Sequence, residues 1–166
     1  SEQMAGLKQS LLDCTVAEID QVIADFKMDP GVPALNHHMP VIDRIFGGNV
    51  TPEQMQERAE DMALMRPNDK LVSHVVTAFA TRCPVSIMLS WRLLQMADDI
   101  ADIGAALTLD YHLAMRMIRR GDYIEGVRAV LVDRDNAPKW SPNSLALVDK
   151  ALLDALFDED GLPPLC

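Results

Sequence analysis

The chain has 166 residues, of which 49% are hydrophobic and 5% aromatic, and its mean hydropathy is +0.03. This length suits one compact domain with a sizeable core, and the apolar content excludes a disordered chain. The net charge of −10 and the pI near 4.7 argue against direct binding to nucleic acid, which requires a basic face. No unbroken apolar run approaches the roughly 20 residues of a membrane span, so no membrane partner is expected.

Residue usage favours helices, because Met, Leu and Ala are plentiful while the aromatic residues that suit strands are scarce. The three cysteines, Cys14, Cys83 and Cys166, are widely spaced and odd in number, which indicates neither a disulfide framework nor a metal knuckle. The first residues lack a basic start followed by an apolar run, so no signal peptide is predicted. We therefore expect a soluble, all-α protein from a reducing compartment.

The first helix signal lies at Thr15 and Glu18, which have the spacing of a capping box. Asp29-Pro30-Gly31 is expected to end this helix. Its apolar residues recur every three or four positions, which predicts one buried stripe. The stripe consists of Val16, Ile19, Val22, Ile23 and Phe26.

Further helices are predicted along the rest of the chain. Thr51 precedes a proline and, three residues later, Gln54, a pattern typical of a helix start. Gly121 is expected to stop a long helix, and the two prolines within 133–142 predict an ordered loop. The predicted helical ranges are 34–46, 52–65, 69–80, 85–96, 101–120, 123–132 and 145–157.

Neither a nucleophile elbow, a P-loop nor a glycine-rich dinucleotide turn is present, so no catalytic residue is predicted. The adjacent His37 and His38 point in different directions, which suits joint metal ligation poorly. His74 and His112 lie among apolar neighbours and are interpreted as structural imidazoles. The carboxylates of Asp98-Asp99 and Asp158-Glu159-Asp160 are interpreted as solvated patches, with calcium binding as the weaker alternative.

The stretch 122–142 carries the strongest functional signal. A helix with a charged start and an apolar body continues into a basic, aromatic loop. In this loop Arg134, Lys139 and Trp140 could bind an anionic ligand that also contains a ring. The alternative is a tethering loop whose tryptophan packs against the body of the protein.

The sequence of this stretch, DYIEGVRAVLVDRDNAPKWSP, resembles the C-terminal signature of the 3-hydroxyisobutyryl-CoA hydrolase branch of the crotonase superfamily. Upstream, residues 83–87 resemble the S-P-x-S-L segment of that branch, with Cys83 in place of Ser. Residues 107–113 resemble its L-x-x-E-Y-x-L helix, with Asp110 in place of Glu. The resemblance is clearest over 82–142 and is limited to the helical pattern over 11–80.

The resemblance implies that residues 1–166 form a single multi-helix domain, the C-terminal region of a crotonase-like protein without its β-β-α core. The oxyanion hole and the acidic catalytic groups belong to that core, so none is assigned in this chain. By the same resemblance Arg134 and Lys139 are candidate contacts to the phosphates of CoA, and Trp140 is an anchoring contact. Arg128 is expected to form an ion pair at its helix end. CoA is part of the substrate, and no separate cofactor is expected.

Two functions remain open. The first is the helical cap of a 3-hydroxyisobutyryl-CoA hydrolase of valine breakdown, mitochondrial in a eukaryote and otherwise cytoplasmic. Such a cap would bind a crotonase core in the same or a separate chain, and alone it would self-associate. The second is a non-enzymatic docking module, such as a hydrolase-like component of the mitochondrial small ribosomal subunit. An exposed apolar patch on the N-terminal helices would favour the cap, because it marks a missing covering layer.

Overall fold

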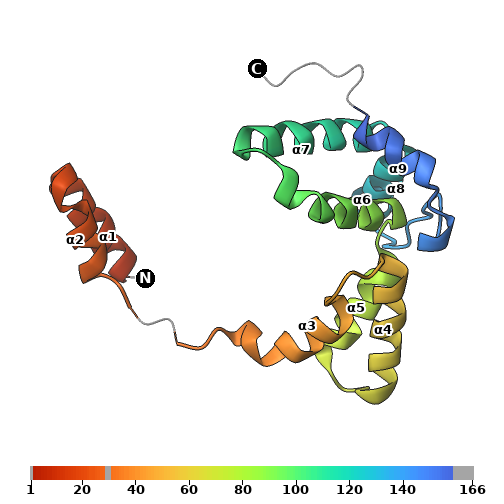
Figure 1. Cartoon of the computed structure of the whole chain (residues 1–166), viewed down its shortest axis with the longest axis horizontal. Helices are drawn as coiled ribbons and strands as arrows, with labels where there is room; N and C mark the ends of the chain where they lie inside the picture. Colours follow the sequence, from red (N-terminus) through yellow and green to blue (C-terminus); the bar gives the residue numbers. More distant parts are fainter. Residues whose placement is uncertain (1, 29–30, 159–166) are drawn as a thin grey trace. The chain divides into compact units, whose positions relative to one another are not determined.

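The computed structural model describes residues 2–28 and 31–158, and every regular element within these ranges is helical. The chain divides into two compact units, Ser1–His38 and Met39–Cys166 (Figure 1). The sequence predicts one domain over 1–166, whereas the structure separates the first 38 residues from the rest.

The first unit begins with helix α1, which the sequence pattern did not predict. Helices α1 and α2 pack against each other, and a Cβ added at Gly6 would lie 3.2 Å from Cε1 of Phe26. The Glu18 carboxylate accepts a hydrogen bond from the Thr15 N–H (2.9 Å), as expected for a capping box, and a second one from the Thr15 hydroxyl (2.7 Å). The elements are α1 (Glu2–Asp13), η1 (Val16–Glu18), α2 (Ile19–Asp25) and η2 (Ala34–His38).

The buried stripe predicted for this unit is only half enclosed. Val16 is 86% and Ile23 49% exposed, while Ile19, Val22 and Phe26 are half-buried. The prediction is wrong for the two exposed residues, because two short helices have too little area to enclose a core. The α2 helix ends at Asp25, and the predicted stop at Asp29-Pro30 lies outside the described residues.

The second unit contains the remaining helices, most of them at the predicted positions. Gly121 is a correction: the long helix ends at Ile118, and Gly121 instead begins the next helix. A glycine alone does not show whether a helix begins or ends at its position, because its backbone can adopt the conformations of both helix ends. The elements are α3 (Met39–Phe46), α4 (Pro52–Met65), α5 (Lys70–Thr81), α6 (Pro84–Gln95), η3 (Ala97–Asp99), α7 (Ile103–Ile118), α8 (Gly121–Val127), η4 (Arg128–Val132, a π-helix), η5 (Leu145–Leu147) and α9 (Lys150–Phe157).

Side chains cap several of these helices where the sequence predicts their starts. Thr51 and Gln54 form the reciprocal hydrogen bonds of a capping box at the first residue of α4. Asp69 accepts hydrogen bonds from two backbone N–H groups of α5, and Asp102 accepts one from Ala105 in α7. These bonds satisfy backbone donors that the helix itself leaves without partners.

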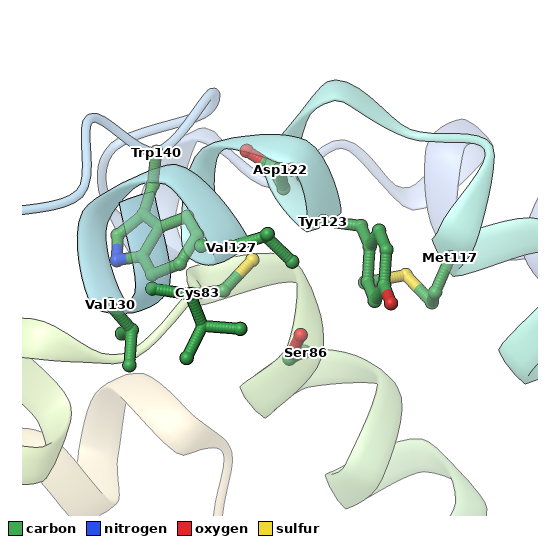
Figure 2. A pocket seen from close by; sticks show the side chains of 10 residues that line it. Cys83, Ser86, Met117, Asp122, Tyr123, Val127, Val130 and Trp140 are labelled. Atoms are coloured by element: carbon green, nitrogen blue, oxygen red, sulfur yellow. The ribbon is translucent and has the colours of Figure 1, made fainter. Parts of the chain in front are cut away.

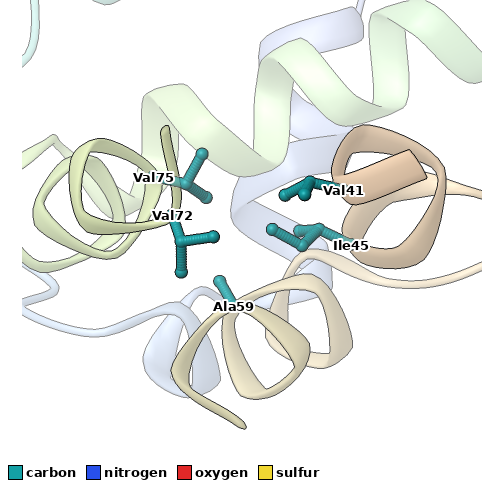
Figure 3. Close-up of a cluster of buried hydrophobic side chains, with 5 residues drawn as sticks. All are labelled: Val41, Ile45, Ala59, Val72 and Val75. Atoms are coloured by element: carbon teal, nitrogen blue, oxygen red, sulfur yellow. The ribbon is translucent and has the colours of Figure 1, made fainter. Parts of the chain in front are cut away.

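Two clusters of buried side chains hold the second unit together. Figure 3 shows the first, between α3, α4 and α5, which comprises Val41, Ile45, Ala59, Val72 and Val75. The second lies between the start of α6, α7 and α9 and comprises Cys83, Val85, Leu113 and Leu156. Trp91 of α6 donates a hydrogen bond to the carbonyl of Val50 (3.0 Å), which ties α6 to the segment before α4.

Among the described residues, no single helix is long and apolar enough to cross a bilayer. Helices α5 and α6 reach the required length and composition only together, and a bend of 114° separates them. Both contribute side chains to the buried clusters of the second unit.

Candidate functional site

Arg128 organises the loop that follows η4. Its guanidinium donates two hydrogen bonds to Glu125 (2.8 and 2.9 Å) and one to Asp135 (2.8 Å), and it also pairs with Asp133. The ion pair expected at this helix end is therefore confirmed. One arginine holds carboxylates from before and after the turn, which fixes the direction in which the loop leaves the helix.

The charges in this cluster shift one another's pKa values. Hydrogen bonds from Arg128, and then from the backbone N–H of Lys139 (2.7 Å), lower the pKa of Glu125 to about 2. Glu125 and the other two carboxylates raise the pKa of Arg128 above its usual range. The Ala137 N–H, followed by Arg128, lowers the pKa of Asp135. These shifts favour the charged forms of Glu125, Arg128 and Asp135.

The far end of the loop is held by Asp122, whose side chain is buried in α8. Its carboxylate accepts hydrogen bonds from the Ser141 N–H (2.9 Å) and from the Arg120 guanidinium (3.1 Å). Arg120 also donates to the Ser141 carbonyl (3.2 Å). Because Asp122 and Glu125 both bind backbone N–H groups of the loop, α8 serves as the frame on which residues 139–141 are placed.

Trp140 anchors the loop on two other elements. Its indole N–H donates a hydrogen bond to the carbonyl of Thr81, the last residue of α5 (2.9 Å). Its ring lies so close to α8 that a Cβ added at Gly126 would be 3.2 Å from Cη2. The glycine of the E-G-V-R motif therefore makes room for the tryptophan. The anchoring role implied for Trp140 fits these contacts.

A largely apolar pocket of about 470 Å³ lies beside Trp140 (Figure 2). The start of α6 contributes Cys83 and Ser86, α7 contributes Met117, and α8 contributes Tyr123 and Val127. The Cys83 thiol is free and buried, as is common for a cysteine that packs as a small apolar residue. Cys14 is also free, and Cys166 lies outside the described residues.

The three predicted ligand contacts do not converge on one cavity. Trp140 lines the apolar pocket, whereas Lys139 lines a neighbouring pocket of about 460 Å³ together with Arg120 and Glu125. Arg134 lines neither; it is exposed, has φ 57°, and its Nε donates to the Leu131 carbonyl (3.5 Å). The structure thus places Trp140 and Lys139 in two neighbouring pockets and leaves Arg134 outside both.

Sequence reasoning missed the carboxylates of α8 that position this loop. Asp122 and Glu125 stand in the quoted motif, but their partners are backbone groups of residues 139 and 141, which carry no sequence signal. The acidic start of a helix followed by a proline-rich loop could have pointed to them, since carboxylates commonly accept bonds from loop N–H groups.

The remaining sequence candidates stay apart. Within residues 2–28 and 31–158 no group of three His, Cys, Asp or Glu side chains is arranged to hold a metal ion. His37 and His38 are exposed, and so is His74, contrary to the expectation that apolar neighbours surround it. His112 is half-buried in α7. Asp98, Asp99 and Asp158 are exposed, while Glu159 and Asp160 lie outside the described residues.

Comparison with known proteins links this arrangement to a family. The family model described as enoyl-CoA hydratase/isomerase matches residues 1–157. A mitochondrial 3-hydroxyisobutyryl-CoA hydrolase of Dictyostelium discoideum is 24% identical over 95% of the chain, and a human one is 27% identical over 97%. A probable 3-hydroxyisobutyryl-CoA hydrolase 2 of Arabidopsis thaliana is 30% identical over 75% of the chain.

Solved structures show the same fold. A carnitinyl-CoA dehydratase from Mycobacterium thermoresistibile matches 95% of the chain with a TM-score of 0.77 and 21% identity. An enoyl-CoA hydratase from Rhodobacter sphaeroides matches 87% with a TM-score of 0.66 and 24% identity. The chain covers 42% and 43% of these two structures, and 34–42% of the three curated relatives. From the family model and the named relatives together, the chain belongs to the enoyl-CoA hydratase/isomerase family, within the crotonase superfamily.

Proposed function

We propose that the chain is the helical C-terminal cap of a 3-hydroxyisobutyryl-CoA hydrolase, which splits its substrate into the free acid and CoA during valine breakdown. The names of the curated relatives support this substrate. The chain spans about two fifths of these relatives, and its described residues contain helices but no strand. The β-β-α core implied by the resemblance would then lie in the rest of the protein. In a eukaryote we place the enzyme in mitochondria, as for these relatives.

Exposed apolar side chains carry the proposal. In the first unit the apolar residues Leu12 and Val16 are 80% and 86% exposed, and we infer that another part of the protein covers them. The second unit has a comparable patch on α8 and η4. It consists of Tyr123, Ile124, Val130, Leu131 and Val132, which are all at least half exposed. A crotonase core is the covering layer that we propose for both surfaces, since helices evolved to cap another layer expose that face when alone.

The loop 133–142 supplies the proposed contacts to CoA. Lys139 and Arg134 are exposed cations, so their side chains are free to form charge-assisted hydrogen bonds to phosphate groups. Trp140 holds the loop in place through Thr81. The hydrolytic step belongs to groups of the core, and this chain contributes binding and shape.

The deciding experiment is to measure the intact mass of the native protein and to assay CoA release from 3-hydroxyisobutyryl-CoA. A longer, active native protein and an inactive 166-residue chain would support the cap. If the native protein has this length, is inactive and is bound to a larger particle, the chain is a docking module and the cap proposal is wrong. Self-association of the isolated chain, measured by analytical ultracentrifugation, is a further expected result.

Substitutions in the loop test the proposed CoA contacts. In the active full-length enzyme, Lys139→Ala and Arg134→Ala should each raise KM about three- to tenfold and leave kcat nearly unchanged, because the lost contacts serve binding only. Lys150→Ala removes an exposed cation on α9, away from the loop, and should leave KM unchanged. If all three variants have the same KM as the unsubstituted enzyme, the proposal that this loop contacts CoA is wrong.

A further inference from the structure

A second pocket, of about 510 Å³, lies in the unit formed by residues 39–166, away from the loop and its apolar pocket. It is formed by η3 with its flanking residues, by one face of α7 and by the end of α9. We call it the His112 pocket. Its lining residues are Met96, Asp99, Ile100, Ala101, Ala105, Thr108, Leu109, His112, Arg116 and Phe157. None of the proposed CoA contacts is among them, so this site goes beyond the proposed function.

Two buried nitrogen atoms in this pocket lack hydrogen-bond partners among the described residues. They are Nε2 of His112 and Nη2 of Arg116, and the two residues that carry them line the pocket. The residues are four positions apart in α7, so their side chains lie on the same face of the helix. Buried polar atoms normally have a hydrogen-bond partner, which can be a protein group, a water molecule, an ion or a ligand.

The surrounding contacts hold both groups in place. Nη1 of Arg116 donates to the carbonyl of Leu156 in α9 (3.2 Å), which leaves the second arm of the guanidinium for another acceptor. The His112 ring lies 5.7 Å from the ring of Tyr111, centroid to centroid. The ring nitrogen Nε2 donates a hydrogen bond when it carries a proton, in one neutral tautomer or in the charged form.

The residues that line the pocket indicate which class of ligand fits it. Met96, Ile100, Leu109 and Phe157 supply apolar surface beside the two nitrogen atoms. Thr108 already donates its hydroxyl hydrogen to the Gly104 carbonyl (2.8 Å), so it can only accept. A pocket with apolar walls, lined on one helix face by an arginine and a histidine that each have a nitrogen without a partner, matches a carboxylate group with an aliphatic tail.

The charged residues around the pocket favour a ligand that carries one negative charge. Asp99, Arg116 and His112 are the titratable residues that line the pocket. The Asp99 side chain is exposed and solvent-screened, whereas the Arg116 nitrogen is buried, so the cation acts more strongly inside. Arg92, beside Phe157, is already paired with Asp154. A dianionic phosphate would face Asp99 with only two donors, which favours a monocarboxylate.

We propose that the His112 pocket binds a small aliphatic monocarboxylate, with its carboxylate on Arg116 Nη2 and His112 Nε2 and its tail against the apolar walls. Titration of the chain with octanoate, octanol and acetate, followed by calorimetry and by the imidazole NMR signals of His112, tests this. Octanoate should bind at least about tenfold more tightly than octanol, which lacks the charge, or acetate, which lacks the tail. Octanoate should also shift the His112 signals.

Variants separate this site from other apolar surfaces. Arg116→Gln and His112→Phe should each weaken octanoate binding by about tenfold or more, because each removes one donor to the carboxylate. Arg119→Gln, at an exposed residue of the same helix end, is the matched control and should leave binding unchanged. If Arg116→Gln does not fold because it has lost the hydrogen bond to Leu156, His112→Phe still tests the site.

Three results would overturn the proposal. They are equal affinities for octanoate and octanol, unchanged octanoate binding in His112→Phe, and no shift of the His112 signals at saturation. If the pocket nitrogen atoms instead bind a carboxylate side chain of the remaining protein, the full-length enzyme will not bind octanoate, which also contradicts a small-molecule site. The CoA-release assay does not depend on these outcomes, so the hydrolase proposal is judged separately.

Discussion

The two units of the chain are built from the same local signals but differ in what they bury. Each contains a capping box, Thr15 with Glu18 in the first unit and Thr51 with Gln54 in the second. In the second unit Ile45 and Val85 are fully buried, whereas none of the residues in η1, α2 or η2 is buried. Local signals therefore form helices in both units, while a core forms only where several helices meet.

Truncation of a buried side chain should have the largest effect and should act on one unit only. Ile45→Ala removes side-chain atoms from the cluster between α3, α4 and α5 and should lower the free energy of unfolding by about 2–5 kcal/mol. Val16→Ala, at an exposed residue of the first unit, should change it by at most about 0.5 kcal/mol. Urea denaturation followed by circular dichroism measures both, and equal effects would contradict the difference between the units.

Removal of the buried Asp122 carboxylate in α8 should have the next largest effect on the free energy of unfolding. Asp122→Ala removes the acceptor of the Ser141 N–H and one of the two acceptors of Arg120, and it should cost about 1.5–3 kcal/mol. The same substitution at the exposed Asp20 in the first unit should be nearly neutral. Trp140 fluorescence, in a Trp91→Phe background, reports whether the loop detaches before the unit unfolds. An unchanged denaturation curve for Asp122→Ala would show that the loop is held by other contacts.

The two capping boxes give a matched pair of smaller changes. Thr51→Ala should cost about 1 kcal/mol in the unfolding of the second unit, since α4 contributes Ala59 to its core. Thr15→Ala removes the hydroxyl that binds Glu18 in a separate unit, so it should leave the unfolding transition reported by Trp91 fluorescence unchanged. A shift of that transition in Thr15→Ala would mean that the two units unfold together.

Most helices could be predicted from the sequence, because their signals are local. The cap at Thr51, the proline of α6 and the apolar periodicity of α5 each act within a few residues. The start of α1 was missed because residues 2–13 have no capping pattern, and Gly121 was assigned the wrong role because glycine occurs at both helix ends. Burial of Val16 could not be predicted, since it depends on which helices pack around it.

In the candidate site, too, local contacts could be predicted from the sequence and long-range contacts could not. The motif at 122–142 identified the right loop and the ion pair of Arg128, because these residues are close in sequence. The contact of Trp140 with Thr81 joins residues 59 positions apart and has no local signal. The unpartnered nitrogen of His112 was equally hidden, because an imidazole among apolar neighbours is normally hydrogen-bonded.

Acid titration gives the smallest expected effect and tests the charge cluster directly. The pKa of Glu125 is lowered from 4.5 to about 2 in the folded protein, first by the hydrogen bonds from Arg128. A lowered pKa stabilises the fold above the unfolded-state value, and this contribution is lost as the pH falls from about 4.5 to about 2. In Glu125→Gln the contribution is absent at every pH, so its stability should fall less steeply with acid across that window. Urea midpoints measured through this range decide the question, with Glu57→Gln on α4 as the control that keeps the steeper fall. Parallel curves for Glu125→Gln and the unsubstituted chain would mean that Arg128 holds the loop through Asp133 and Asp135 alone.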